Sequence, residues 1–284
     1  MIDDLPPLRE VIAAHGLGAN KSFGQHFLLD LNLTRKIASL AGDISDQNAI
    51  EIGPGPGGLT RGILAHGTGS LLVVEKDSRF LGALCEIGEA YPGTLRTVEA
   101  DALKVDEPSV LPDGPCTILS NLPYNVGTLL LIKWLEASPI WWRRAVLMFQ
   151  REVADRVVAQ PGSKAYGRLA ILSQSVCETR LALKIPARAF TPPPKVESAV
   201  VVLDPLPEDQ RFDDLKALGE VTASAFGQRR KTLRRSLAAA AGKTRASAEE
   251  LLQAADIDPG LRAETIDIAG FQKLARAWRA ATAP

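Results

Sequence analysis

The stretch Ala49-Ile50-Glu51-Ile52-Gly53-Pro54-Gly55-Pro56-Gly57-Gly58 decides the fold class of this chain. It predicts a short apolar strand and a glycine-rich turn, after which Leu59, Ile63 and Leu64 open a helix. Strand, glycine turn and helix in this order are typical of the first unit of a Rossmann-like sheet, in which glycines let the backbone approach a ligand closely. The stretch therefore predicts an α/β fold with a ligand site at the turn.

The ligand at this turn is expected to be neutral or cationic. Gly53, Gly55 and Gly58 fit the pattern G-x-G-x-x-G, but this match is weak on its own. The two prolines of the turn remove backbone N–H donors that a pyrophosphate would need, and the Glu51 carboxylate would lie beside that phosphate. A dinucleotide-dependent oxidoreductase is therefore a rival interpretation that these residues disfavour.

Four successive strands are each predicted to end in a glycine or a polar residue. The strands are expected at 49–52, 71–74, 95–99 and 116–120, and the residues at their ends are Gly53, Glu75, Asp101 and Asn121. Because parallel strands end at the same edge of a sheet, these residues should lie together. Glu75 follows the turn by about twenty residues, where an acidic side chain takes ribose hydroxyls. Asp101 suits an adenine amino group, although it could instead cap a helix that begins at Ala102.

The run Asn121-Leu122-Pro123-Tyr124 ends the fourth strand and suggests a site for a planar base. Asn121 offers a side-chain oxygen as an acceptor, Leu122 and Pro123 carry backbone carbonyls, and Tyr124 offers a flat face for stacking. Such acceptors beside a ring suit a base with an exocyclic amino group. Phe190, in a proline-rich segment, is a candidate for stacking on the opposite face of that base. Taken alone, the run could equally be an ordinary turn.

The second half of the chain changes from strands to helices. Strands are expected at 145–149, 180–185 and 198–203, and the last two are close enough to be antiparallel, which gives a sheet with a reversed last strand. From Phe212 onward the apolar spacing is helical. This helical part carries basic residues in a segment, 227–245, that contains no acid: Arg229, Arg230, Lys231, Arg234 and Arg235. We interpret this segment as a contact for a polyanion, with a solvated surface as the alternative.

Composition sets broad limits on the class of protein. The 284 residues are 46% hydrophobic and 23% charged with a formal net charge of zero, as in ordinary globular proteins. The three cysteines, Cys85, Cys116 and Cys177, are far apart, so neither a metal site nor a disulfide framework is predicted. This cysteine usage suits a reducing compartment, and no signal peptide or transmembrane run is present, so a cytoplasmic location is expected.

Several motifs together resemble a known family. The turn at Glu51–Gly57, Glu75, Asp101 and Asn121–Tyr124 look like an S-adenosylmethionine-dependent methyltransferase acting on adenine N6. Further motifs resemble the small-subunit rRNA adenine N6,N6-dimethyltransferases, the KsgA/RsmA family, from about Lys21 to the end of the chain. These motifs are Gly24-Gln25-His26-Phe27-Leu28, Gln150-Arg151-Glu152-Val153-Ala154, Phe190-Thr191-Pro192-Pro193-Pro194-Lys195-Val196-Glu197-Ser198 and Phe226-Gly227-Gln228-Arg229-Arg230-Lys231. The family usually has Asn where this chain has His26.

The resemblance implies a fold, a division into domains and an activity. The fold would be a Rossmann-like S-adenosylmethionine-dependent methyltransferase sheet with a reversed last strand, plus a small C-terminal all-helical domain. Residues 1–20 would be an N-terminal extension, 21–205 the methyltransferase domain and 206–284 a helical RNA- or ribosome-binding domain. The activity would be dimethylation of two adjacent adenines near the 3′ end of 16S rRNA in the 30S subunit, as part of ribosome biogenesis. The enzyme would be a monomer that needs no metal and binds no membrane.

The resemblance also assigns roles to residues. Asn121 and Leu122 would hold the adenine amino group through oxygen acceptors, so that its lone pair faces the methyl sulfonium, and Pro123, Tyr124 and Phe190 would complete the catalytic set. The residues implied for S-adenosylmethionine are His26, Leu28, Gly53, Gly55, Glu75, Asp101 and Asn121. Two alternatives remain: an Erm-type enzyme that dimethylates 23S rRNA, and a non-catalytic ribosome-assembly or nucleic-acid-binding protein on the same fold.

Overall fold

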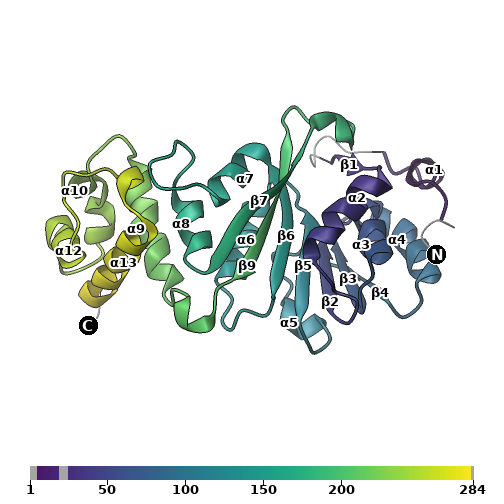
Figure 1. Cartoon of the computed structure of the whole chain (residues 1–284), viewed down its shortest axis with the longest axis horizontal. Coiled ribbons are helices and arrows are strands. Elements are labelled where there is room, and N and C mark those ends of the chain that lie inside the picture. Colours follow the sequence, from purple (N-terminus) through teal and green to yellow (C-terminus); the bar gives the residue numbers. More distant parts are fainter. Residues whose placement is uncertain (1–4, 19–24, 283–284) are drawn as a thin grey trace. The chain divides into compact units, whose positions relative to one another are not determined.

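The computed structural model describes residues 5–18 and 25–282 of the chain (Figure 1). Its contacts divide the chain into two compact units, one of Met1–Ala154 with Arg180–Asp204 and the other of Asp155–Thr179 with Pro205–Pro284. The expected division kept residues 155–179 in the methyltransferase domain, whereas these contacts group them with the C-terminal helices. What either unit does stays a prediction at this point.

A seven-stranded sheet has the strand order β4-β3-β2-β5-β6-β9-β7. Strands β4 through β6 are parallel, and β9 pairs with β6 in antiparallel register from Ala145↔Leu203 to Gln150↔Ser198. This confirms the Rossmann-like sheet with a reversed last strand. The strands are β2 (Asn48–Ile52), β3 (Ser70–Glu75), β4 (Leu95–Glu99), β5 (Cys116–Asn121), β6 (Arg144–Gln150), β7 (Cys177–Ile185) and β9 (Ser198–Pro205).

Helices connect the parallel strands, as this topology requires. Strands β2, β5 and β6 are buried over nearly their whole length, which is typical of a parallel sheet covered on both faces. Strands β2 and β5 are neighbours although they are not consecutive in the chain, so the strand order reverses between them. The helices of this part are α1 (Leu8–Ala14), α2 (Leu31–Ala38), α3 (Gly58–His66), α4 (Leu81–Ala90), α5 (Glu107–Val110), α6 (Gly127–Leu135) and α7 (Arg151–Val157).

A second, two-stranded sheet was not predicted. Strand β1 (Phe27–Leu28) pairs with β8 (Phe190–Thr191) in antiparallel register, with Leu28 opposite Phe190. Strands of two residues are too short to give a periodic pattern, which is why the sequence does not reveal them. The pairing joins two motifs of the family resemblance that are far apart in the chain. Gly24, the first residue of the Gly24–Leu28 motif, and residues 19–23 before it lie outside the described residues.

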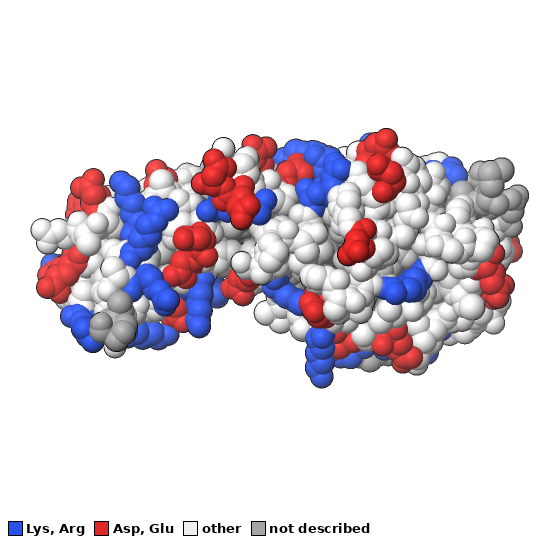
Figure 2. Space-filling view, turned by 90° about the horizontal axis from the view of Figure 1, so that it is seen from below, with Lys and Arg blue, Asp and Glu red and all other residues white. Residues whose placement is uncertain are grey.

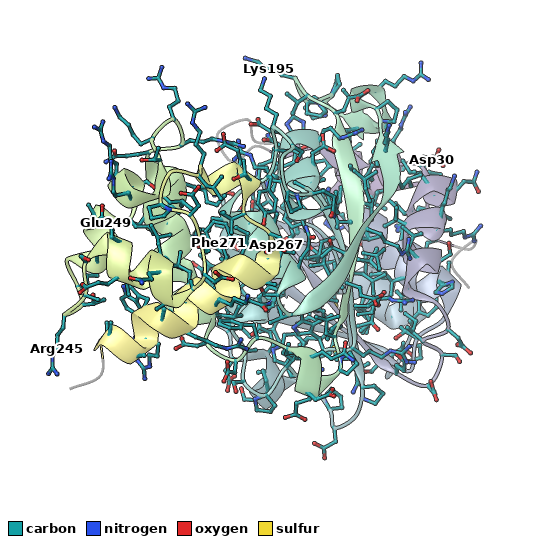
Figure 3. The ribbon with its side chains drawn as sticks, turned by 60° about the vertical axis from the view of Figure 1, so that its left-hand side comes forward. Asp30, Lys195, Arg245, Glu249, Asp267 and Phe271 are labelled. Carbon is teal, nitrogen blue, oxygen red and sulfur yellow. The ribbon has the colours of Figure 1, made fainter. Side chains whose placement is uncertain are left out.

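The second unit is helical. Its core includes an aromatic cluster in which Phe226 lies 5.6 Å from Phe271 and 6.1 Å from Tyr166 between ring centroids. Phe271 lies on the long C-terminal helix and Asp267 directly precedes that helix, as Figure 3 shows. No helix among the described residues is long and apolar enough to span a lipid bilayer. The helices of this part are α8 (Arg168–Gln174), α9 (Leu215–Gly227), α10 (Leu233–Ser236), α11 (Ala238–Ala241), α12 (Ala248–Ala254) and α13 (Ile268–Thr282).

Short 3₁₀ helices complete the chain. They are η3 (Ser39–Ala41), η4 (Ser78–Phe80), η5 (Ala187–Ala189), η6 (Glu208–Gln210) and η7 (Ala263–Thr265). The first of them directly continues α2, so this α-helix ends in a 3₁₀ turn. Such tightening of the last turn is common at helix ends.

Gly62 allows α3 to pack closely against α2. A Cβ atom at this position would lie 2.6 Å from the Thr34 carbonyl carbon and 2.7 Å from its oxygen, so backbone would have to move. We expect Gly62→Ala to lower the free energy of unfolding by about 3 kcal/mol, the upper range for overpacking. Gly88→Ala is the matched control, because the nearest atom, Leu95 Cδ2, is 4.0 Å away. Urea denaturation checks both variants, and equal stability of Gly62→Ala and wild type would contradict this packing.

Candidate functional site

A cavity of about 910 Å³ lies at the carboxyl ends of the parallel strands, where the strand order reverses between β2 and β5. In open α/β sheets this is the place where ligands bind. The lining residues come from β1, the glycine turn and the segments that follow β3, β4 and β5. They include these predicted site residues: His26, Leu28, Gly53, Gly55, Glu75, Asp101, Asn121, Leu122, Pro123 and Tyr124.

The glycine turn is held firmly against the end of β5. Gly53 and Gly55 have φ angles of +67° and +54°, which side chains adopt rarely. A Cβ atom on Gly53 would lie 3.3 Å from Pro123 Cγ, so the turn and the Asn121–Tyr124 segment are in close contact. The Ser120 hydroxyl donates to the Ile52 carbonyl at 2.6 Å and ties the same two strand ends together. Glycine is therefore needed for both the conformation and the contact.

Glu75 lies between the glycine turn and the cavity. Its Oε2 accepts a hydrogen bond from the Gly55 N–H at 3.0 Å, and its Oε1 accepts from the N–H groups of Lys76 and Asp77 at 2.8 Å. The side chain is 7% exposed, and burial raises the pKa of Glu75 although these three hydrogen bonds oppose the shift. A carboxylate can accept about four hydrogen bonds, so capacity remains for a ligand hydroxyl.

Glu51 forms a buried acidic part of the cavity wall. Only 1% of the residue is exposed, and the Thr60 hydroxyl donates to its Oε2 at 2.6 Å. Burial raises the pKa of Glu51 to about 8, with the nearby Glu75 charge acting in the same direction. The group is therefore mostly neutral at pH 7. A cationic ligand would lower this pKa, which agrees with the expectation that the turn favours a neutral or cationic ligand.

Asp101 lies at the end of β4 and does not cap a helix. Its Oδ1 accepts from the Leu103 N–H at 3.1 Å, but residues 102–104 form a turn. Lys76 Nζ donates to the other oxygen at 2.8 Å, and this bond is the largest cause of the lowered pKa of Asp101. The lowered pKa keeps the Asp101 carboxylate ionised. Asp101 and Lys76 both line the cavity.

Lys133 is a supporting residue that was not predicted from the sequence. From α6, its Nζ donates to the carbonyls of Ala102 and Val105 and to Glu107 Oε1, the first at 3.0 Å and the last at 2.8 Å. Trp134 Nε1 donates to the same Glu107 oxygen at 2.9 Å. These bonds hold the segment after Asp101 to the helix that follows Tyr124. The signal in the sequence was a single lysine within an apolar run, which predicts a partner for its charge.

The Asn121-Leu122-Pro123-Tyr124 segment leaves two oxygen acceptors without a partner. The Pro123 carbonyl accepts from the N–H groups of Val126 and Gly127, which begins α6. In contrast, no hydrogen bond involves the Asn121 side chain or the Leu122 carbonyl within residues 5–18 and 25–282. Both residues line the cavity. The segment therefore presents a pair of neighbouring acceptors to a ligand.

Tyr124 is fixed by contacts on two sides. Its hydroxyl lies 3.0 Å from Ser198 Oγ, and its ring centroid lies 6.0 Å from that of His26 with a tilt of 35°. His26 Nδ1 donates to the Pro192 carbonyl at 2.7 Å, because a carbonyl can only accept. Burial raises the pKa of Tyr124, so the phenol stays neutral. The flat ring is thus held at the cavity as the base-stacking hypothesis requires.

Phe190 is placed differently from the other predicted catalytic residues. It is 3% exposed, packs in the main hydrophobic cluster and lies opposite Leu28 in the small sheet. It is not among the residues that line the cavity. Stacking of Phe190 on a base opposite Tyr124 stays a prediction. Lys195, from the same proline-rich loop, projects outward instead (Figure 3).

The basic residues of the helical unit have different environments. Arg229 Nη2 donates to the Tyr166 carbonyl at 3.0 Å, and Arg234 pairs with Glu249 at 3.3 Å. Arg230, Lys231 and Arg235 are exposed and form no ion pair with any described residue. Figure 2 shows basic and acidic side chains on one face of this part of the chain. Three of the five predicted RNA contacts are therefore free to meet a polyanion, whereas Arg229 and Arg234 have intramolecular partners.

Comparisons with known proteins agree with this geometry. Residues 16–274 match the family model described as "Ribosomal RNA adenine dimethylase". The chain is 73% identical to the "Ribosomal RNA small subunit methyltransferase A" of Maricaulis maris, covering 99% of this chain and 97% of the relative, and 55% identical to that of a Ruegeria species, covering 97% of each.

Solved structures show the same fold. A dimethyladenosine transferase from Plasmodium falciparum has a TM-score of 0.74 at 25% identity, covering 88% of this chain and 96% of that one. The 23S rRNA methyltransferase ErmE has a TM-score of 0.64 at 22% identity, covering 89% and 99%. The fold and the family imply S-adenosylmethionine as the methyl donor. The chain belongs to the ribosomal RNA adenine dimethylase family.

Proposed function

We propose that this protein transfers methyl groups from S-adenosylmethionine to the N6 atoms of two adjacent adenines near the 3′ end of small-subunit rRNA. The observation that carries the proposal is the pair of unengaged acceptors, Asn121 Oδ1 and the Leu122 carbonyl, beside the Tyr124 ring. The relatives' printed name, "Ribosomal RNA small subunit methyltransferase A", supports the small-subunit substrate over the Erm type.

The methyl donor would occupy the cavity on the side of the glycine turn. Glu75 has acceptor capacity left for ribose hydroxyls, and Asp101 is an ionised acceptor for an amino group of adenine. Gly53 and Gly55 let the backbone approach closely, and His26 and Leu28 border the same space. When bound, S-adenosylmethionine supplies a methyl group on a positively charged sulfur, and this charge would favour the ionised form of the buried Glu51.

The chain's own residues would act on the adenine by positioning it. The lone pair of an aromatic amino group is delocalised into the ring, which makes the nitrogen a poor nucleophile. If Asn121 Oδ1 and the Leu122 carbonyl accept its two N–H bonds, the nitrogen is held toward tetrahedral geometry and its lone pair is directed at the methyl group. Tyr124 stacks on the base, and Pro123 stiffens the segment. Such catalysis consists of orientation and electrostatics.

The rRNA would be held by both units within the 30S subunit. Arg230, Lys231 and Arg235 are exposed basic residues of the helical unit that form no ion pair with a described residue, so they suit contacts to phosphate. The target adenine must leave its stack to enter the cavity, as for other enzymes that modify a base. We propose that the protein acts as a monomer in the cytoplasm during subunit biogenesis.

The raised pKa of Glu51 predicts a pH dependence of stability. Between the unfolded value of 4.5 and the folded value of about 8, the unfolded chain loses this proton and the folded chain keeps it. Its contribution is complete below pH 4.5 and is lost as pH rises through about 8, by about 1.4 kcal/mol per pH unit. Glu51→Gln should remove this slope, so the free energy of unfolding of the variant minus that of wild type should increase between pH 5.5 and pH 8. Denaturation at several pH values in this range measures both free energies, and an equal dependence on pH in the two proteins would contradict the prediction.

The experiment that tests the proposed function measures transfer of labelled methyl groups from S-adenosylmethionine. The acceptors are small and large ribosomal subunits that lack the modification. We expect about four methyl groups per small-subunit rRNA, since each of two adenines is modified twice, and none in large-subunit rRNA. Transfer to large-subunit rRNA would favour the Erm alternative, and binding without any transfer would favour a non-catalytic assembly protein.

A further inference from the structure

A second cavity, of about 640 Å³, lies next to the proposed methyl-donor site within the first unit. The two cavities share Leu28 and Gly58, so β1 forms part of the wall between them. Three arginines line the second cavity, namely Arg9, Arg61 and Arg188. The proposed methyl transfer gives these arginines no role.

Arg61 is a buried cation that forms no ion pair with any described residue. It is 7% exposed on α3, and its Nη1 donates to the Pro6 carbonyl at 2.7 Å. Its Nε is buried and has no hydrogen-bond partner. No carboxylate of a described residue lies within ion-pair distance of this guanidinium. A buried donor without an acceptor is unfavourable, so an anion in the cavity would satisfy it.

The other charges of the cavity do not neutralise Arg61. Arg9 and Arg188 are exposed and form no ion pair within residues 5–18 and 25–282. Asp30 (labelled in Figure 3) is the one carboxylate of the lining, and its Oδ1 accepts from the N–H groups of Asn32 and Leu33 at 2.9 and 3.3 Å. This carboxylate caps α2 and is not paired with an arginine. The lining therefore carries three cations and one anion.

The lining also favours a phosphate group in particular. An arginine guanidinium is a planar fork that binds phosphate oxygens in pairs. Leucine side chains also line the cavity, including Leu8 and Leu29, and such apolar surroundings strengthen charge interactions. An isolated small anion would leave most of a 640 Å³ space unfilled, whereas a nucleic-acid backbone would fill it.

We propose that this cavity holds a phosphodiester of the rRNA strand close to the adenine that is methylated. The inference rests on the proposed function. Thr191 of β8 lines this cavity, and the next residue, Pro192, accepts the hydrogen bond from His26, whose ring lies beside Tyr124. Strand β8 thus links the arginine cavity to the base site over a few residues. The RNA backbone that leads into the base site would cross β8 and place a phosphate among Arg9, Arg61 and Arg188.

The test uses the two exposed arginines, because a change at buried Arg61 could unfold the chain. Arg9→Ala with Arg188→Ala should weaken binding of small subunits about 10-fold, measured with S-adenosylhomocysteine present. The slope of log affinity against log salt should become shallower by about 0.7 to 0.9 for each phosphate that the variant no longer neutralises. Arg188→Glu should weaken binding more than Arg188→Ala because it repels phosphate. Affinity for S-adenosylhomocysteine and the rate at saturating subunit should stay at wild-type values.

Arg96→Ala is the matched control, because Arg96 is an exposed arginine on β4 outside both cavities and should bind like wild type. Wild-type affinity and salt slope in the double variant would overturn the inference, as would an equal loss in Arg96→Ala. Methylation of small subunits by the wild-type protein, measured in the same samples, keeps the outcomes separate. If the wild-type protein transfers methyl groups and the arginine variants bind normally, only the phosphate site is refuted. If the wild-type protein transfers no methyl groups at all, the proposed function is refuted.

Discussion

Asn121→Ala is expected to lower the rate constant for methyl transfer by about 10³-fold, because the variant loses one of two acceptors that orient the adenine amino group. The Asn121 side chain has no partner within the described residues, so its removal breaks no internal hydrogen bond. Folding and binding of the small subunit should therefore be nearly unchanged. Affinity for S-adenosylhomocysteine should fall by at most about fivefold, or roughly 1 kcal/mol, since the residue also borders the donor site.

Single-turnover methylation of saturating small subunits measures this rate constant directly. Asn32→Ala is the control, because it makes the same chemical change at an exposed position of α2. Calorimetry with S-adenosylhomocysteine and a thermal melt show whether the site is intact. A rate for Asn121→Ala within tenfold of wild type would contradict the proposed role of this oxygen.

Glu75→Gln is expected to weaken binding of S-adenosylhomocysteine by about 100-fold, or roughly 2.7 kcal/mol. The carboxylate accepts from three backbone N–H groups and retains capacity for ribose hydroxyls. The amide keeps one acceptor oxygen, but its NH₂ group would face N–H donors. In the wild type, the raised pKa of Glu75 further predicts that affinity falls when pH drops and the carboxyl takes up a proton.

The control for this variant is Glu99→Gln, since Glu99 is exposed and lies directly opposite Glu75 in the β3–β4 register. Calorimetry at pH 7.5, with a melt to confirm folding, measures both variants. If Glu75→Gln bound within threefold of wild type, the ribose would have to be held elsewhere.

The strand ends were predictable from the sequence because each depends on local chemistry. Predicted strands followed by Gly53, Glu75, Asp101 and Asn121 indicate a shared edge, and the structure places all four around one cavity. The reversed last strand was predictable from the short connection between two β-like runs, and β9 confirms it.

What the sequence could not show depends on contacts between distant segments. The β1–β8 pair joins residues far apart in the chain and buries Phe190. Arg229 lies in a basic run, but its guanidinium donates to the Tyr166 carbonyl and stabilises the helical unit. The hydrogen bonds of Lys133 likewise depend on carbonyls that only the folded chain brings together. None of these contacts produces a periodic pattern in the sequence.

The most direct test of the account is nucleoside mass spectrometry of rRNA from unmodified small subunits treated with wild type and with Asn121→Ala. We expect two N6,N6-dimethyladenosines, at adjacent positions near the 3′ end of the small-subunit rRNA, after treatment with wild type. We expect almost none after treatment with the variant, although the variant still binds the subunit. Methylation at another base or atom, or equal dimethylation by the two proteins, would contradict it.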